Sequence, residues 1–412
     1  MGWTSKGRPG RPDYVILGLV GALVALGLVA VYSSSFVIGY EQYGTGRYFV
    51  IRQAMWALVG IVLLAVFARV DYHRLRALCV PFLVLTIGAL AVVFLPGLGL
   101  ERNGATRWLA LGPLPPIQPS EFAKLAIIIY IAAWASAKGE NIRRFSMGFL
   151  PFIVIIGFVG GLVMREPDMG TTVMLFLIAT TIFFLAGAPL SHMLLLALGG
   201  GIIALGLVST SGYRADRLTV FLTPDLDPQG VGFHTRQLLI ALGSGGIGGL
   251  GLGASRQKFG YIPGSHTDGV FAIIGEEMGF IGGLAVILLL GILVWRGLRV
   301  ARRARDSFGS LLALGVTFWI AYQSLINIGG VTRSIPLTGI PLPFISYGGS
   351  ALATLLAGVG IVLNVSRHPR TDERPAERGA RPPAAGKAGH GPPTKSAIAW
   401  GPRHARTGKV RA

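Results

Sequence analysis

The sequence predicts an all-α polytopic membrane protein with about ten transmembrane helices and one large extracytoplasmic loop. The chain of 412 residues is 52% hydrophobic and only 13% charged, and its mean hydropathy is +0.62. Its apolar runs recur at about 20 residues, the length that crosses the hydrocarbon core of a bilayer. Because backbone polar groups in lipid need internal hydrogen bonds, these runs are expected to be helices. This composition excludes a soluble domain.

The membrane domain is expected at 13–367, after a basic cytoplasmic N-terminus at 1–12 and before a basic cytoplasmic tail at 368–412. The tail is rich in Pro, Gly, Ala and Arg and poor in apolar residues, a composition typical of disorder. A large extracytoplasmic loop is expected at 211–267. The expected spans are 13–36, 50–69, 76–97, 118–136, 145–164, 168–188, 190–210, 269–296, 308–332 and 346–366.

The net charge of +19 is attributed to membrane topology and not to nucleic-acid binding, because Lys and Arg concentrate in cytoplasmic loops of membrane proteins. With both termini in the cytoplasm, the inner loops carry Arg69, Arg74, Arg76, Lys138, Arg143, Arg144, Arg296, Arg299, Arg302, Arg303 and Arg305, and the short outer loops only Arg47, Arg102, Arg107, Arg165 and Arg333. All the motifs below then lie on the outer side, where an enzyme cannot use cytoplasmic ATP. The single cysteine, Cys79, excludes an intrachain disulfide.

The segment RWLALGPLPPIQPSEFAK supplies the first candidate site residues. Its prolines prevent a regular helix until the fourth span begins. Glu121 and Lys124 are three residues apart in that span, so they share a helix face. They form either an internal salt bridge or a site where Lys124 meets an anionic substrate. Arg107 adds a guanidinium, and Trp108 is either an interfacial anchor or a stacking surface for a sugar or lipid head group.

Acidic residues mark two further outer segments. Asp168, in MREPDMGTT, either caps the sixth helix, or lines a site, or does both. Asp268 follows a Gly/Pro-marked loop and stands at the expected N-cap of the eighth span, where a plain capping role is the alternative to a functional one. Glu276 and Glu277 come next, inside an apolar helix, where an acid requires a functional or a buried and paired role.

The loop at 211–267 is long enough to carry function. YRADRLTVFLTP supplies Arg214 and Arg217, and HTRQLLIALGSG predicts a short amphipathic helix lying in the membrane interface. The glycines from Gly243 to Gly248 match G-x-G-x-x-G, but no βαβ context surrounds them. We interpret them as an elbow that lets the backbone approach a neighbour closely.

Several of these motifs resemble the SEDS family (shape, elongation, division and sporulation). They are RWLALG, IQPSEFAK, EPDMGTT, YRADRLTVFLTP, GLGASRQKFGYIPGSHTD, FAIIGEEMGFIG and IPLTGIPLPFISYGGS, spread over about 13–368. SRQKFGYIP and AIIGEE are more similar to the cell-division branch of the family than to the elongation branch. The chain departs from the family pattern at Gly264, where Glu is usual, at Gly269, where a bulky residue is usual, and at Arg333.

The resemblance implies a peptidoglycan glycosyltransferase that polymerises lipid II. It implies that Asp268 is catalytic, as a general base, and that Trp108 takes part. It places Glu121, Lys124 and Asp168 in the same outward-facing cavity. His266 and Thr267, in the HTD motif, are expected to bind substrate together with Arg107, Trp108, Glu121, Lys124, Asp168, Arg214 and Arg217.

The implied chemistry explains why few acids are needed. The lipid pyrophosphate departs without a proton, so positive charge, not a second carboxylic acid, must assist it. Lys124, Arg107, Arg214 and Arg217 are the candidate cations, with a divalent ion (Mg or Mn) as the alternative. No cofactor is otherwise expected. A single base with direct displacement inverts the donor's anomeric centre.

The resemblance also implies partners and a location. A single-span transpeptidase, a class B penicillin-binding protein, is expected to crosslink the product beside other divisome proteins in the bacterial cytoplasmic membrane. Two alternative functions remain at this point. A lipid II flippase would suit the acids inside the membrane, and a division scaffold would do no chemistry.

Overall fold

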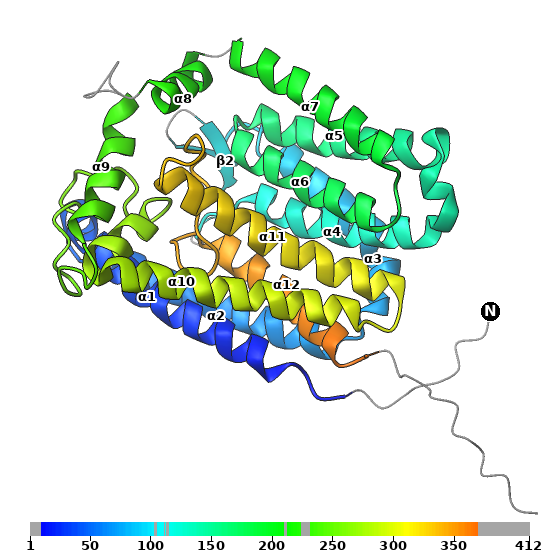
Figure 1. Ribbon diagram of the computed structural model, residues 1–412, viewed down its shortest axis with the longest axis horizontal. Coiled ribbons are helices and arrows are strands. Elements are labelled where there is room, and N and C mark those ends of the chain that lie inside the picture. The colour runs from blue at the N-terminus through cyan, green and yellow to red at the C-terminus, as the bar shows by residue number, and fades with distance from the viewer. Residues whose placement is uncertain are drawn as a thin grey trace, which may run out of the picture. The chain divides into compact units, whose positions relative to one another are not determined.

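The computed structural model describes residues 10–102, 105–110, 112, 115–209, 212–223 and 231–369. Its helices in chain order are α1 (Tyr14–Tyr43), α2 (Tyr48–Arg69), α3 (His73–Val92), α4 (Pro119–Lys138), α5 (Leu150–Arg165), α6 (Met169–Leu185), α7 (Leu190–Ser209), α8 (Gly212–Leu222), α9 (Val231–Ser244), α10 (Val270–Arg302), α11 (Ser307–Val331) and α12 (Ser350–Ser366). Short 3₁₀ and π turns, Gly139–Arg143 and Phe145–Phe149, join α4 to α5. Figure 1 shows the long helices running side by side.

The described helices confirm the predicted polytopic membrane fold. Seven of them are long and apolar enough to cross a bilayer, and three shorter apolar helices, Met169–Leu185, Leu190–Gly206 and Ser350–Ser366, coincide with the remaining predicted spans. Large apolar side chains are exposed along α2, α5, α7 and α10. Lipid tails are as apolar as these side chains, so in a bilayer this exposure is not costly.

The centre of the bundle is formed by α4, α11 and α12. Every residue from Ser350 to Val365 is buried, and α12 packs closely along α2. A Cβ on Gly60 would lie 3.1 Å from the Cα of Ala353, and one on Gly360 would lie 2.6 Å from the Leu64 carbonyl oxygen. Small residues therefore let the two backbones approach each other, as is common between helices in membranes.

Two elements differ from the sequence-based prediction. The chain is not entirely helical, because β1 (Gly99–Arg102) and β2 (Ala105–Leu109) form an antiparallel hairpin before α4. The last helix begins at Ser350 and not at 346, because the FISYGG stretch before it is irregular. Irregular backbone inside a membrane protein is tolerated where protein surrounds it.

The helix α10 is interrupted, and the glycine-rich stretch after α9 supplies hydrogen bonds to the backbone at the interruption. Gly279 adopts φ 66° and ψ −164° inside the helix, which leaves neighbouring backbone groups without helical partners. Gly246 O accepts from Phe280 N at 2.9 Å, and Leu250 N donates to Glu276 O at 3.0 Å. The predicted elbow therefore does bring one backbone close to another.

The first and last described segments meet at one end of the bundle. Asp13 N donates to Ser366 Oγ at 3.1 Å, and Gly10 N donates to Arg367 O at 2.7 Å. The carboxylate of Asp13 also pairs with Arg296 at 2.7 Å. An even number of spans requires this arrangement, which agrees with the predicted count of ten. Figure 1 shows α8, α9 and β2 gathered at the opposite end.

Candidate functional site

A proline-rich segment (335–343) between α11 and α12 connects the elements that carry the candidate residues. Arg217 of α8 donates from Nη1 to Leu337 O at 2.9 Å. The first turn of α6 also touches this segment, since a Cβ on Gly170 would lie 3.0 Å from Ile340 Cγ1. Residues that are far apart in the chain therefore meet at this segment.

Asn327 and Gln323 of α11 hold the same segment through their side-chain amides. Asn327 Nδ2 donates both to Ile340 O at 2.8 Å and to Asp268 O at 3.0 Å. Gln323 Nε2 donates to Pro341 O at 2.9 Å. Side-chain amides thus replace the backbone hydrogen bonds that the prolines prevent.

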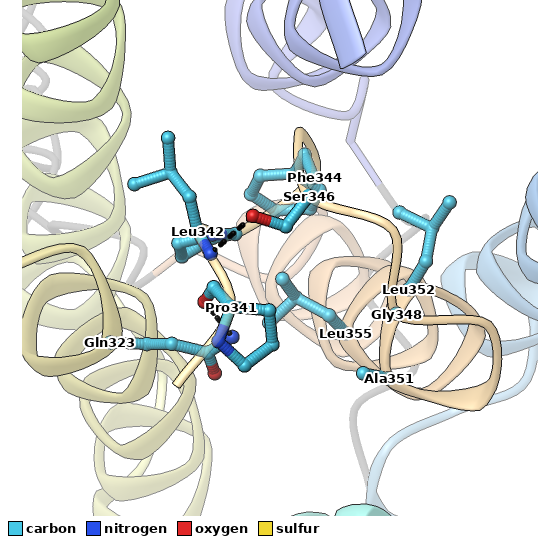
Figure 2. Close-up of a pocket in the computed structure, with 10 residues that line it drawn as sticks. Gln323, Pro341, Leu342, Phe344, Ser346, Gly348, Ala351, Leu352 and Leu355 are labelled. Atoms are coloured by element: carbon cyan, nitrogen blue, oxygen red, sulfur yellow. Dashed lines mark hydrogen bonds between the residues drawn. The ribbon is translucent and has the colours of Figure 1, made fainter. Parts of the chain in front are cut away.

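A small pocket lies where the segment turns toward α12. Figure 2 shows Gln323 reaching Pro341, and Ser346 accepting from the backbone N–H of Leu342 at 2.8 Å. The pocket is lined by Gln323, Pro341, Leu342, Pro343, Phe344, Ser346, Gly348, Ala351, Leu352 and Leu355. Its free volume of about 10 Å³ is the space of a single water molecule. It is far too small for a sugar, so it belongs to the packing of this segment.

Asp268 ends the loop before α10, but it is not at the predicted N-cap position, and the capping alternative is therefore not observed. The N-cap position is Gly269, and no side chain caps this helix. The Asp268 carboxylate instead lies beside the turn at Gly264–Thr267, with Oδ1 accepting from Thr267 Oγ1 at 3.0 Å. On its other side, a Cβ on Gly339 would lie 3.7 Å from Oδ2. The carboxylate therefore faces the proline-rich segment and is partly exposed.

The predicted salt bridge between Glu121 and Lys124 is present and buried. Lys124 Nζ lies 2.9 and 2.8 Å from the two Glu121 oxygens, and the side chains are 2% and 4% exposed. Nζ also lies 3.5 Å from Gln323 Oε1 and 5.1 Å from the Trp319 ring centre. The charge of Lys124 is therefore neutralised by Glu121 inside the protein.

Asp168 caps α6, as one of the predicted alternatives proposed. Its Oδ1 accepts from Thr171 N at 3.0 Å, and Oδ2 accepts from Thr171 Oγ1 at 2.8 Å. Gln118 Nε2, at the start of α4, donates to Oδ2 at 3.3 Å. Asp168 is 8% exposed, so its main visible role is to fix the turn between α5 and α6.

Arg107 ties the β-hairpin to that turn. Its Nε donates to Glu166 O at 3.0 Å, and Nη2 donates to Pro167 O. Trp108, next to it in β2, pairs with Leu100 of β1 and is partly exposed. Both carboxylate oxygens of Glu166 are buried without a hydrogen-bond partner in the described part of the chain. Burial, with the charge of Asp168, raises the pKa of Glu166 to about 8.

His266 and Thr267 shape the loop that carries Asp268. The His266 ring packs on Phe49 at 4.5 Å and on Tyr347 at 5.6 Å between ring centres, and its carbonyl oxygen accepts from Tyr347 N at 2.8 Å. Burial lowers the pKa of His266 to about 4. The imidazole is therefore neutral and acts in packing, while Thr267 contacts Asp268 directly.

Glu276 and Glu277 are buried and have polar partners, as the buried and paired alternative for these acids requires. Glu276 accepts from Arg256 N at 3.0 Å and from Ser255 Oγ at 2.5 Å. Glu277 forms an ion pair with Lys258 at 3.2 Å and accepts from Ser33 Oγ at 2.6 Å. Both acids hold the loop that runs on to Asp268.

The structure therefore groups Asp268, Arg217 and Asp168 around one segment and attaches Arg107 and Trp108 through the neighbouring turn. The Glu121–Lys124 pair contacts this segment through Gln323, which reaches both Lys124 and Pro341. The side chain of Arg214 lies outside the described residues, although its backbone belongs to α8. Within the described ranges, no three His, Cys, Asp or Glu residues come together as metal ligands.

Sequence reasoning did not identify the side-chain amides of the site. Gln118, Gln323 and Asn327 are buried or half-buried and connect the candidate residues to one another. The available signal was their presence in or next to apolar spans, where polar groups need partners. Charged residues drew attention first because they are the more costly groups to bury.

Fold and site together define a predominantly helical, multi-pass membrane protein with a cluster of charged residues at one end. The family model FTSW_RODA_SPOVE, described as a cell cycle protein, matches residues 14–371. The chain belongs to this family, as its SEDS-like motifs predicted.

Individual relatives support this membership. The chain is 42% identical to stage V sporulation protein E of Bacillus subtilis over 87% of this chain and 98% of that protein. It is also 42% identical to a probable peptidoglycan glycosyltransferase FtsW of Trichlorobacter lovleyi, over 86% and 93%.

Solved structures show the same fold. A chain in a study titled "Structural coordination of polymerization and crosslinking by a peptidoglycan synthase complex" matches with TM-score 0.70 and 29% identity, over 86% of this chain and 98% of that one. The rod shape determining protein RodA of Thermus thermophilus matches with TM-score 0.61 and 27% identity, over 86% and 97%.

Proposed function

We propose that this protein is a peptidoglycan glycosyltransferase that polymerises lipid II at the outer face of the cytoplasmic membrane, with Asp268 as the general base. The observation that carries the proposal is that few contacts hold the Asp268 carboxylate. It caps no helix, has no ion pair within the described residues, and lies beside Gly339 where the backbone leaves room. The names of the FtsW relatives supply the reaction class.

The chemistry requires one proton transfer and one departing anion. The 4-hydroxyl of the acceptor sugar gives its proton to the Asp268 carboxylate while its oxygen attacks C1 of the donor sugar. The bond from C1 to the pyrophosphate oxygen breaks, and the lipid pyrophosphate leaves with the electron pair. A positioned base contributes roughly 10²- to 10⁴-fold to such a step. Direct attack inverts the anomeric centre.

The departing pyrophosphate needs positive charge near Asp268. Lys124 is poorly suited because Glu121 already neutralises it. Arg107 donates to carbonyl oxygens, which have no net charge, so its own charge remains available. Arg217 lies at the same proline-rich segment, where it donates to the Leu337 carbonyl oxygen. We assign the pyrophosphate to these two arginines, since guanidinium groups bind phosphate oxygens in bidentate fashion.

We further propose that the protein acts in cell division, with both termini in the cytoplasm. The Lys and Arg bias of the loops supports the orientation, and the FtsW relatives support the role. A class B transpeptidase is the expected partner. The structure titled as a peptidoglycan synthase complex coordinating polymerisation and crosslinking supports such a pairing.

The test is polymerisation of fluorescent lipid II by the purified full-length chain with its transpeptidase. Long glycan strands from the wild type and none from Asp268→Asn or Asp268→Ala are expected. Glu140→Gln, an exposed acid after α4, is the control and should polymerise normally. Lipid II transport across vesicle membranes without any polymer would instead indicate a flippase. Division activity in cells without either reaction would indicate a scaffold.

A further inference from the structure

The helix α9 packs against the first turns of α10, and glycines let the two approach closely. A Cβ on Gly269 would lie 3.3 Å from Leu238 Cδ2, and one on Gly275 would lie 2.5 Å from Leu242 Cδ2. Leu238 is fully buried. Leu238 therefore packs opposite the residue that follows Asp268.

His234 lies one helical turn before Leu238, on the same face of α9. Residues four apart on a helix lie one above the other. Leu238 and Ala241 on this face are both fully buried, so the face is turned toward α10 and its preceding loop. His234 lies one turn before Leu238 on this face, and Leu238 contacts Gly269, so His234 is placed near the loop that carries Asp268.

The state of the imidazole agrees with this placement. His234 Nε2 is buried and has no hydrogen-bond partner among the described residues. Burial lowers the pKa of His234, the nearby charge of Asp268 raises it, and that of Arg217 lowers it. Both charged groups, Asp268 from the loop before α10 and Arg217 from α8, are therefore close enough to act on the ring.

An unpaired buried polar atom lowers stability because it has lost its hydrogen bonds to water, and a substrate hydroxyl can replace them. A neutral imidazole offers one donor and one acceptor nitrogen. It also adds no positive charge that would pair with Asp268 and weaken it as a base. The amphipathic pattern of α9 did not predict a role for His234 at the site, because a His on an interfacial helix is expected to belong to its polar face.

We propose that His234 is a substrate-positioning residue whose Nε2 hydrogen-bonds a hydroxyl of the acceptor sugar bound at Asp268. The inference rests on the proposed function and extends it. The bond orients the sugar so that its nucleophilic oxygen faces the carboxylate. The transferred proton still goes to Asp268, and no covalent step involves His234.

The experiment compares His234→Ala and His234→Gln in the full-length chain with its transpeptidase. Lipid II polymerisation is measured as a function of substrate concentration and pH. His234→Ala should lower kcat/KM roughly tenfold, the size of one lost hydrogen bond to a buried group. His234→Gln should recover most of the rate, because the amide also offers a donor and an acceptor. Arg236→Gln, on the exposed side of α9, should behave as wild type.

The pH profile separates positioning from a structural role. Wild-type activity should fall on the acid side partly through protonation of His234, and His234→Gln should lack that component. Unchanged kcat/KM and pH profile in a folded His234→Ala would overturn the inference. The inference would also be overturned if His234→Ala and His234→Gln lost the same amount of activity and the same amount of melting temperature while both kept the wild-type pH profile. If Asp268→Asn still polymerises lipid II, the proposed function fails, whatever His234 does.

Discussion

Asn327 holds Asp268 and Ile340 with a single amide group, donating to their carbonyl oxygens at 3.0 and 2.8 Å. The two hydrogens of Nδ2 are both used, so the amide fixes the distance between the loop that carries Asp268 and the proline-rich segment. Neither backbone carbonyl is close to Asn327 in the sequence. This relationship makes Asn327 the residue on which the shape of the candidate site depends most directly.

Asn327→Leu is expected to lower kcat/KM by about 10²-fold, because a displacement of about 1 Å at a reacting group can cost that much. The matched control is Asn364→Leu. Asn364 makes the same double contact, to Phe67 O and Val70 O, but at the far end of α12. Both variants should lose similar stability in a thermal melt. Equal activities for the two would show that the Asn327 contacts do not position Asp268.

Lys124→Met is expected to destabilise the protein by about 3–5 kcal/mol, because it leaves Glu121 as a buried, uncompensated charge. The double variant Lys124→Met with Glu121→Gln removes both charges and should recover much of the stability and of the polymerisation rate. Denaturation in detergent and the lipid II assay measure the two effects. A double variant that folds but makes no glycan would assign Lys124 to the substrate instead.

Glu166 should make stability fall as the pH rises. Its pKa is raised from 4.5 to about 8, so between these values the folded state keeps a proton that the unfolded state releases. Unfolding therefore becomes more favourable by up to about 1.4 kcal/mol per pH unit. Glu166→Gln should flatten this dependence and melt higher than wild type near pH 8. If the melting temperatures of the wild type and of Glu166→Gln change in parallel from pH 5 to 8 (about the window that the cited values define), the assignment is contradicted.

Gly264 occupies a backbone conformation that favours glycine, with φ 70°. A Cβ there would lie 2.7 Å from Asp268 Oδ1 and from Thr267 Oγ1. Gly264→Ala should therefore cost about 1–2 kcal/mol of backbone strain and also displace the carboxylate, lowering the polymerisation rate. Gly260→Ala is the control, since its φ is 86° and nothing lies within 4 Å of its Cβ. If both variants retain full activity, the carboxylate tolerates this displacement.

The number and approximate positions of the spans could be predicted because bilayer thickness dictates helix length. The pairing of Glu121 with Lys124 followed from helical spacing, and the capping role of Asp168 from its place before an apolar run. These features depend on local sequence or on the lipid bilayer, which is the same environment for every span.

The rest depends on contacts between distant segments. Asp268 was expected at the N-cap position, with capping as one of two alternatives, but the tight turn at Gly264 directs its side chain elsewhere and the N-cap is Gly269. The break at Gly279 is stabilised by a backbone stretch about 30 residues earlier. His234 is brought near Asp268 only because α9 packs against the start of α10. Periodicity within one helix cannot reveal such pairings.

The most direct test of the central claim is the single-turnover rate of glycosidic bond formation by Asp268→Asn at saturating lipid II. We predict a rate roughly 10²-fold or more below that of the wild type, with lipid II binding and melting temperature retained. A rate within a few-fold of the wild type would contradict the account, since a carboxamide cannot accept the proton that the acceptor hydroxyl must lose.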